Sequence, residues 1–270
     1  MLAQVHIEKT AGQTLLNVLH QSFPGQHCDF RNYFKHTGIA TADDLRFAMR
    51  VYPLLKSIAG HSIRPYSNLT DACPDLRYYT FLRDPVMRCV SHFQFRINGA
   101  RGKYVPDFDA WLVKSANYQT RFLTGTEDAD AAIEMLQTRV GFVGLVEQFN
   151  ESLVLLKSWS DQRQLKIRYR SRNIAEDNQI KRQILDDAKQ CQAVIDHNQE
   201  DIKLYRYVCE QIYPRQLADY GPRLQTDLSR LEASLPAPRQ VSLSIALSNA
   251  HRWFLYKPGD WLRRAGKKAA

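Results

Sequence analysis

The chain has 270 residues, a hydrophobic content of 44%, a charged content of 24% and a formal net charge of +9. This is the composition of an ordinary globular protein that is long enough for one large domain with an appendage. The positive charge favours nucleotides, anionic polysaccharides, nucleic acid or an anionic membrane surface as partners. Because no RNA- or DNA-binding motif is present, we expect no nucleic-acid partner.

The N-terminus shows neither a signal peptide nor a membrane span, since a first strand is expected almost at Met1. The cysteines are odd in number and lack the spacing of a metal or redox motif; they are Cys28, Cys73, Cys89, Cys191 and Cys209. We therefore expect reduced, largely buried thiols, no metal centre and a cytoplasmic location, with peripheral membrane contact as a further option.

A strand, a tight loop and a helix are expected at the start of the chain. Gln4 to Ile7 form the strand, and the apolar spacing from Leu15 to Phe23 is helical. The loop between them is Glu8, Lys9, Thr10, Ala11, Gly12, Gln13 and Thr14. Free N–H groups and the helix dipole make such a loop a site for phosphate or sulfate. In a nucleoside-triphosphate P-loop the lysine comes last, whereas Lys9 precedes the glycine and would face a bridging oxygen of the anion. An ordinary turn with a surface lysine is the alternative.

The next segments lead to a second strand. Residues 26–42 are polar and predict a loop, and residues 42–55 predict a helix capped by Thr41 or Asp43. Residues 56–61 predict a short strand that ends at Gly60 and His61, and residues 62–73 form a turn-rich connection.

The stretch from Tyr78 to Leu82 is aromatic and predicts a central strand. Asp84 followed by Pro85 predicts a helix that begins at once. Arg83 would then lie at the carboxyl end of the strand, where ligands bind in doubly wound sheets, with Ser91 two turns into the helix. A guanidinium and a hydroxyl in these places suit a phosphate. The alternative is an ion pair between Arg83 and Asp84.

The segments after residue 116 predict two helices and one strand. Residues 117–125 could be a packed loop or a functional segment. Residues 126–138 predict a helix, residues 140–146 predict a strand that ends at Glu147, and residues 150–158 predict a second helix. Residues 165–169 predict a last strand, followed by an arginine-rich segment in which Arg170 and Asn173 are candidates for an anion contact, although a solvated basic loop fits as well. Residues 178–214 predict a long helical region, broken near His197.

We divide the chain into a main domain, residues 1–220, and a C-terminal extension, residues 221–270, because prolines mark breaks around one short helix. The tail combines Trp253, Phe254, Leu255, Trp261 and Leu262 with basic residues at 252, 257, 263, 264, 267 and 268. Residues 251–268 could therefore lie on an anionic membrane, pack on the domain or bind a partner.

Two motifs carry a resemblance to a known family. The first loop resembles the 5′-phosphosulfate loop of sulfotransferases, H-I-P-K-T-A-G-T-T-L, with Glu8 for the proline and Gln13 for the first threonine. The second stretch is similar to their 3′-phosphate site, F-x-R-D-P-x-x-R-x-x-S-x-(Y/F), which Arg83 and Ser91 match. Over about residues 4–215 the chain resembles family 2 carbohydrate sulfotransferases, among them the uronyl and heparan 2-O-sulfotransferases.

The resemblance implies a P-loop-like three-layer α/β fold with a central parallel sheet flanked by helices, here with a C-terminal helical extension. It also implies 3′-phosphoadenosine 5′-phosphosulfate (PAPS) as donor, no metal, and a carbohydrate or glycoconjugate hydroxyl as acceptor. The cofactor would be bound by Lys9, Thr10, Ala11, Gly12, Gln13, Thr14, Arg83, Ser91, Arg170 and Asn173.

Lys9 and His61 are the catalytic candidates. His61 matches a G-H pair that supplies the base in the 2-O-sulfotransferases, and free imidazole titrates near ~6.5, which suits that role. A structural histidine is the alternative, with Glu8, Glu147 and His92 as other candidates for the base. Two other functions stay open: a P-loop kinase-like phosphotransferase, and a non-catalytic relative that binds a glycan or a nucleotide.

Overall fold

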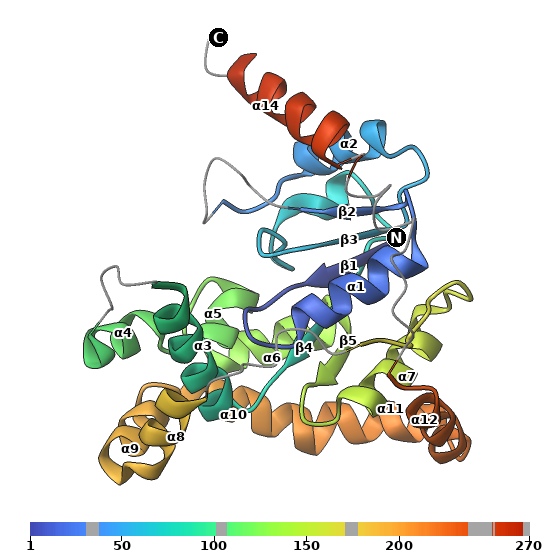
Figure 1. The fold of residues 1–270 in the computed structure, drawn as a ribbon. Coiled ribbons are helices and arrows are strands. Elements are labelled where there is room, and N and C mark those ends of the chain that lie inside the picture. The colour runs from blue at the N-terminus through green and yellow to red at the C-terminus, as the bar shows by residue number, and fades with distance from the viewer. Residues whose placement is uncertain (31–37, 101–106, 171–177, 237–249, 251, 267–270) are drawn as a thin grey trace.

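The structure is a computed structural model that describes residues 1–30, 38–100, 107–170, 178–236, 250 and 252–266. A sheet of five parallel strands forms its centre, in the order β2-β3-β1-β4-β5 (Figure 1). The strands are β1 (Leu2–Val5), β2 (His27–Asp29), β3 (Ser57–Gly60), β4 (Arg77–Leu82) and β5 (Val140–Leu145). Nearly every strand residue is buried, as expected for a parallel sheet that is covered on both faces.

Helices cover both faces, so the expected α/β class with a central parallel sheet is confirmed. The connection from β1 through α1 (Gly12–Ser22) runs toward the β2 edge of the sheet, whereas the connection from β4 to β5 runs the other way. Because such crossovers are right-handed, the two connections place their helices on opposite faces. Figure 1 shows α1 in front of the sheet.

The other elements before β5 are α2 (Ala42–Val51), η1 (Asn68–Asp71), α3 (Pro85–Ala100), α4 (Phe108–Ser115), α5 (Tyr118–Thr124) and α6 (Ala129–Thr138). After β5 come α7 (Phe149–Ser160), α8 (Gln179–Asp186), α9 (Ala188–Asp196), α10 (Gln199–Tyr207), the π-helical η2 (Val208–Ile212), α11 (Tyr213–Tyr220), α12 (Leu224–Ala233), the π-helical η3 (Arg252–Tyr256) and α14 (Lys257–Gly266). Both expected caps form: Thr41 caps α2 in a capping box with Asp44, and the Asp84 carboxylate accepts from the Met87 N–H at 2.8 Å.

Two sequence-based predictions of secondary structure are wrong. Residues 27–29, expected in a loop, form the edge strand β2. Residues 165–169, expected to form a last strand, do not pair with the sheet. The reason is Gln216 of α11, whose side-chain amide accepts from the Val143 N–H at 3.0 Å and donates to the Val143 carbonyl at 2.8 Å. This side chain occupies main-chain groups at the outer edge of β5 that another strand would need.

The long C-terminal helical region is also more divided than expected. A break near His197 is confirmed between α9 and α10. A second break falls at Asp187, whose carboxylate caps α9 by accepting from the N–H groups of Lys189 and Gln190. The helical run then continues past Pro214 to Tyr220, since Pro214 lies in the first turn of α11, where proline is tolerated.

The C-terminal extension shares the core of the main domain. Leu231 of α12 and Tyr256 of η3 belong to the same buried apolar cluster as the sheet. A smaller cluster joins α3, α4, α8 and α9; it consists of Cys89, Val90, Phe93, Trp111, Leu112, Ile184 and Val194. The five cysteines are free thiols, two of them fully buried. In the part of the chain that the structure describes, no helix has the length and apolar character needed to cross a bilayer.

Candidate anion site

The loop after β1 is held in an unusual backbone conformation. Lys9 and Ala11 both adopt positive φ angles, 70° and 59°, and α1 begins directly after Ala11. The Thr10 hydroxyl donates to the carbonyl of Ile7 at 3.0 Å, which ties the loop to the end of the strand. The N-cap residue of α1, Ala11, provides no side-chain cap, so within the described residues the first N–H groups of the helix have no capping side chain.

Gly12 is required by the packing of this loop. A Cβ atom at this position would lie 1.6 Å from Nε2 of His6, a buried side chain that follows β1. The first turn of α1 therefore rests on the His6 ring. Of the other loop residues, Gln13 is exposed and Thr14 is buried.

Lys9, His61 and Arg83 follow three adjacent strands, β1, β3 and β4, at their carboxyl ends. The strand order reverses between β1 and β4, because the chain leaves these neighbours in opposite directions, and such switch points are where ligands bind in open α/β sheets. Nη1 of Arg83 donates to the main-chain carbonyl of Lys9 at 3.2 Å. The structure thus brings these three candidates to one edge of the sheet.

The edge carries the positive charges of Lys9 and Arg83. Burial, and secondly the charge of Arg83, lower the pKa of Lys9, although Glu8 opposes the shift. Burial also lowers the pKa of Arg83, although the carboxylates of Glu147 and Asp84 oppose the shift. Within the described residues, neither cation has a salt bridge, and Nε of Arg83 is buried without a hydrogen-bond partner. An anion bound here would supply an acceptor for Nε of Arg83 and a direct ion pair for both cations.

A third cation near this edge was not anticipated. Burial, and then the charge of Arg83, lower the pKa of Lys181 on α8. The backbone N–H of Lys181 donates to the Gln94 side chain on α3 at 3.1 Å, which fixes the start of α8 against α3. Lys181 follows Arg83 by almost a hundred residues, so no local spacing could have revealed it.

Arg83 is positioned by the segment of residues 117–125. The Gln119 side chain accepts from the Arg83 N–H at 3.0 Å and donates to the Arg83 carbonyl at 2.8 Å. The buried Asp201 carboxylate accepts from the N–H groups of Gln119 and Thr120 at 3.0 and 2.7 Å, which caps α5. Residues 117–125 therefore comprise α5 and its two cap residues, Asn117 and Gly125, and support the end of β4.

His61 is oriented through its main-chain neighbours. Its Nδ1 lies 2.8 Å from the carbonyl oxygen of His6, and the two rings are 4.1 Å apart. A carbonyl only accepts, so this bond places the proton on Nδ1, and in the neutral ring the lone pair is then on Nε2. Arg64 donates to the His61 carbonyl at 2.6 Å. Gly60 is required because a Cβ there would meet the Phe30 carbonyl oxygen at 1.9 Å.

Glu8 and His92 form a separate, largely buried pair. Nε2 of His92 lies 2.9 Å from the Glu8 carboxylate, and its Nδ1 lies 3.4 Å from Nη1 of the fully buried Arg88. Burial opposes ionisation of Glu8, but the hydrogen bond of His92 and the charges of His92, His61 and Arg96 outweigh it and lower the pKa of Glu8 to about 2. Burial also lowers the pKa of His92 itself. Burial and the Glu8 carboxylate raise the pKa of Tyr118 to about 12. Both ring nitrogens of His92 are thus engaged by charged neighbours.

Glu147, the remaining candidate base, also has structural partners. Its carboxylate accepts from the Asp84 N–H at 3.1 Å and from the Tyr205 hydroxyl at 2.7 Å. It therefore links the start of α3 to α10.

The other predicted cofactor residues are less closely tied to this edge. Ser91 is half-buried on α3, and no hydrogen bond of its side chain is among the contacts of the described residues. Arg170 is exposed, next to Tyr169, whose hydroxyl donates to Asn150 at 2.7 Å. Asn173 lies outside the described residues. The roles of these residues remain predictions.

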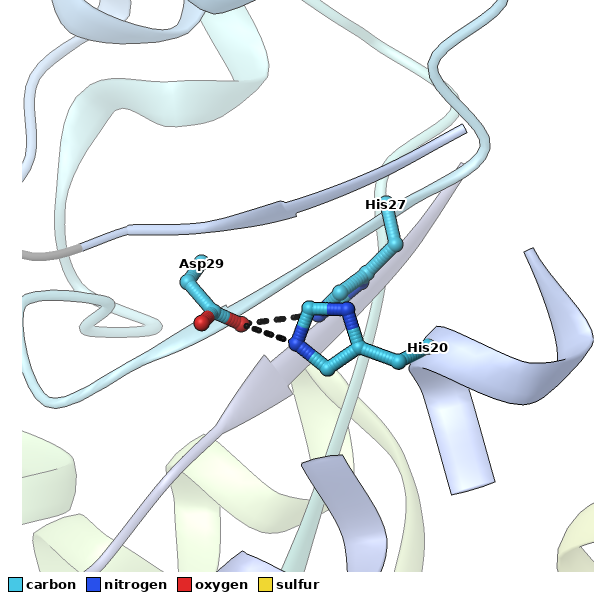
Figure 2. A group of neighbouring side chains, drawn as sticks. All are labelled: His20, His27 and Asp29. Atoms are coloured by element: carbon cyan, nitrogen blue, oxygen red, sulfur yellow. Dashed lines mark hydrogen bonds and ion pairs between the residues drawn. The ribbon is translucent and has the colours of Figure 1, made fainter. Parts of the chain in front are cut away.

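A second polar cluster lies at the far edge of the sheet (Figure 2). Oδ1 of Asp29 on β2 lies 3.2 Å from Nε2 of His20 on α1 and 3.1 Å from Nε2 of His27, and Nη1 of Arg252 lies 2.6 Å from Oδ2. The cluster offers three possible metal ligands within 4.8 Å of one another. Hydrogen bonding to both histidines lowers the pKa of Asp29 far below its usual value in spite of its burial. This geometry is that of a carboxylate held by two imidazoles and a guanidinium.

No protein-family model matches this sequence, and no curated protein matches it. The likeness to sulfotransferases therefore rests on the sequence motifs alone.

Proposed function

We propose that this chain is a sulfotransferase that moves a sulfuryl group from PAPS to a hydroxyl of a carbohydrate or glycoconjugate. The observation that carries the proposal is that Lys9 and Arg83 follow the adjacent parallel strands β1 and β4 and are joined by the 3.2 Å bond from Arg83 to the Lys9 carbonyl. The two sequence motifs thus meet at one edge of the sheet. The buried, unpartnered Nε of Arg83 supports binding of a phosphate there.

The loop supports the P-loop-like reading of the fold. A strand, a loop with two left-handed residues and the uncapped N-terminus of α1 follow one another, which is an arrangement that exposes main-chain N–H groups to an anion. The 5′-phosphosulfate would lie on this loop, beside Lys9. The 3′-phosphate would lie between Arg83 and Ser91, as the sulfotransferase motif implies.

The proposed reaction is an in-line displacement at sulfur. The acceptor oxygen forms a bond to sulfur while the bond from sulfur to the bridging oxygen of the 5′-phosphate breaks, which releases adenosine 3′,5′-bisphosphate. Lys9 stabilises the negative charge that grows on the bridging oxygen. Nε2 of His61 takes the proton of the acceptor hydroxyl, since its Nδ1 is held by the His6 carbonyl.

Titration with nucleotides tests the proposed site. We expect adenosine 3′,5′-bisphosphate to bind much more tightly than adenosine 5′-phosphate, and more tightly than ATP with magnesium. Preference for ATP with magnesium would favour the kinase-like alternative instead. Equal affinity for the bisphosphate and the monophosphate would overturn the 3′-phosphate site.

Transfer of labelled sulfate from PAPS to a panel of glycans, glycolipids and small alcohols tests the activity. Labelling of a sugar hydroxyl is the expected result. Tight binding of the bisphosphate without transfer to any member of the panel would favour the non-catalytic alternative.

A further inference from the structure

The C-terminal segment from Arg252 to Gly266, comprising η3 and α14, is attached firmly to the β2 side of the molecule. Tyr256 is buried, with its ring centroid 6.4, 5.7 and 5.9 Å from those of Phe30, Phe47 and Tyr52. In Figure 1 the segment lies beside α2 and forms the outer end of the molecule. It is therefore a fixed part of the fold.

Two arginines strengthen this attachment. Arg252 forms an ion pair with the Asp29 carboxylate at 2.6 Å. Figure 2 shows this carboxylate bonded to His20 and His27. Arg263 binds Asp44 at the start of α2 and Asp260 at 2.8 Å. All three carboxylates are buried, so these pairs fix which side of the segment faces the domain.

The opposite side of the segment is strongly apolar. Of the ten large hydrophobic side chains that are exposed in the described residues, five lie here: Trp253 (59% exposed), Phe254 (78%), Leu255 (55%), Trp261 (54%) and Leu262 (63%). Phe254 and Trp261 are seven residues apart, as are Leu255 and Leu262, a spacing that puts each pair on one side of a helix. The other five are spread over four separate regions of the chain: Ile39, Met49 and Leu54, Phe95, and Val113.

We infer that this apolar side is a membrane-binding surface, which inserts into the interface of an anionic phospholipid bilayer. Tryptophan, which supplies two of the five side chains, is enriched at membrane interfaces because one part of its ring is apolar and its N–H is polar. Lys257 lies next to this surface, with its ammonium 2.8 Å from the centroid of the Trp253 ring. The one acidic residue of the segment, Asp260, is already paired with Arg263, and the whole chain carries a net charge of +9. Charge and apolar surface together fit an anionic membrane.

Co-sedimentation of the full chain with vesicles tests this inference. We expect binding to vesicles of phosphatidylcholine with phosphatidylserine, weaker binding to phosphatidylcholine alone, and a blue shift of tryptophan emission when the protein binds. Added salt should weaken the binding to phosphatidylserine. Equal binding to both kinds of vesicle would overturn the anionic part of the inference, and no binding would overturn all of it.

A pair of variants distinguishes membrane binding by this surface from non-specific binding of exposed hydrophobic side chains. The double variant Phe254→Ser, Trp261→Ser should bind vesicles at least tenfold more weakly, because burial of each such side chain shifts an equilibrium by about a decade or more. Its thermal midpoint should stay unchanged, since both side chains are exposed. The matched control Leu54→Ser, Val113→Ser replaces two side chains that are as exposed, 68% and 63%, but lie elsewhere, and should bind like the wild type.

Sedimentation velocity without lipid tests the main competing occupant, a second copy of this chain. Concentration-dependent dimers that the double variant abolishes, together with no vesicle binding, would assign the surface to self-association. A monomer that binds phosphatidylserine vesicles supports the inference.

Discussion

The guanidinium of Arg83 donates a hydrogen bond to the main-chain carbonyl of Lys9 across 3.2 Å, and thereby joins the ends of two adjacent strands. This bond uses one N–H group of the Arg83 guanidinium, while its buried Nε has no hydrogen-bond partner among the described residues. The same residue can therefore shape the loop after β1 and bind an anion beside it. Changes at Arg83 and at Lys9 should consequently have different effects.

Arg83→Ala should weaken the binding of adenosine 3′,5′-bisphosphate by at least tenfold. Loss of one partner of a buried charged pair costs about 2–5 kcal/mol, and about 1.4 kcal/mol corresponds to a decade. Binding of adenosine 5′-phosphate should change much less. Isothermal titration with both nucleotides measures the difference.

Arg77→Ala is the matched control for this experiment. Arg77 lies at the opposite end of β4 and donates to the carbonyls of Trp159 and Ser160 at 2.6 and 3.1 Å. Its loss should lower stability without changing the preference between the two nucleotides. A similar loss of preference in both variants would mean that Arg83 acts only through the fold.

Lys9→Ala should lower kcat strongly and change the dissociation constant of the bisphosphate much less. The reason is that the ammonium would face the bridging oxygen, where charge grows only as the bond to sulfur breaks. Single-turnover transfer with saturating PAPS, together with equilibrium binding, measures both quantities. If binding is lost and the rate at saturation is kept, Lys9 is only an anchor for the phosphate.

Gly12→Ala should lower the free energy of unfolding by about 1–3 kcal/mol, because its Cβ would overlap the buried His6 ring and force the loop to move. Affinity for the bisphosphate should fall with it. Gly99→Ala is the control, since a Cβ at this helical position meets no atom within 4 Å. It should be neutral or stabilising by up to about 1 kcal/mol, as measured by denaturant unfolding.

Much of the candidate site could be predicted because it depends on local signals. The lysine-containing loop, the cap formed by Asp84 and the strand that ends at Gly60 are each specified by a few neighbouring residues. The order of strands then brings Lys9, His61 and Arg83 to one edge. These predictions needed only strand ends and parallel pairing.

The errors come from contacts between distant parts of the chain. Residues 27–29 are polar, yet they form a buried strand because His20, His27 and Arg252 satisfy Asp29. Residues 165–169 are apolar enough for a strand, but Gln216 of α11 already occupies main-chain groups of Val143. The hydrogen bond between Gln119 and Arg83, and the electrostatic interaction of Lys181 with Arg83, likewise connect residues that are far apart in sequence.

Glu8 should make stability depend on acid pH. Its pKa is lowered from 4.5 to about 2 in the folded protein, so its contribution to stability is complete well above pH 4.5 and is lost as the pH falls toward 2. We expect about 1–2 kcal/mol at neutral pH, since one pKa unit corresponds to about 1.4 kcal/mol and the side chain is 32% exposed to screening solvent.

The variant Glu8→Gln isolates this contribution. It should be less stable than the wild type at pH 7, and the two unfolding free energies should converge between pH 5 and pH 2, a range that follows from the lowered pKa of about 2. Glu134→Gln, which changes an exposed carboxylate on α6, should show no such convergence. A constant difference between the wild type and Glu8→Gln would contradict an ionised, hydrogen-bonded Glu8.

His61→Ala should lower kcat by at least two decades and leave the affinity for the bisphosphate nearly unchanged. A general base contributes about 10²–10⁴-fold, and Nε2 of His61 would face the acceptor while Nδ1 is held by the His6 carbonyl at 2.8 Å. For the wild type, kcat/KM should rise with pH through one ionisation, and His61→Ala should lack this limb. Rates measured across pH with saturating PAPS test both statements.

His197→Ala is the matched control for His61→Ala, because its Nδ1 also bonds a main-chain carbonyl, that of Ala193 at 2.9 Å, but it lies between α9 and α10. This variant should keep the rate and the pH profile of the wild type. Thermal midpoint and rate, measured on the same sample of each variant, distinguish catalysis from folding. If His61→Ala is destabilised but its folded fraction is fully active, then His61 is structural and the base must be Glu147 or His92. Glu147 would first have to release Asp84 and Tyr205, and His92 would have to release Glu8.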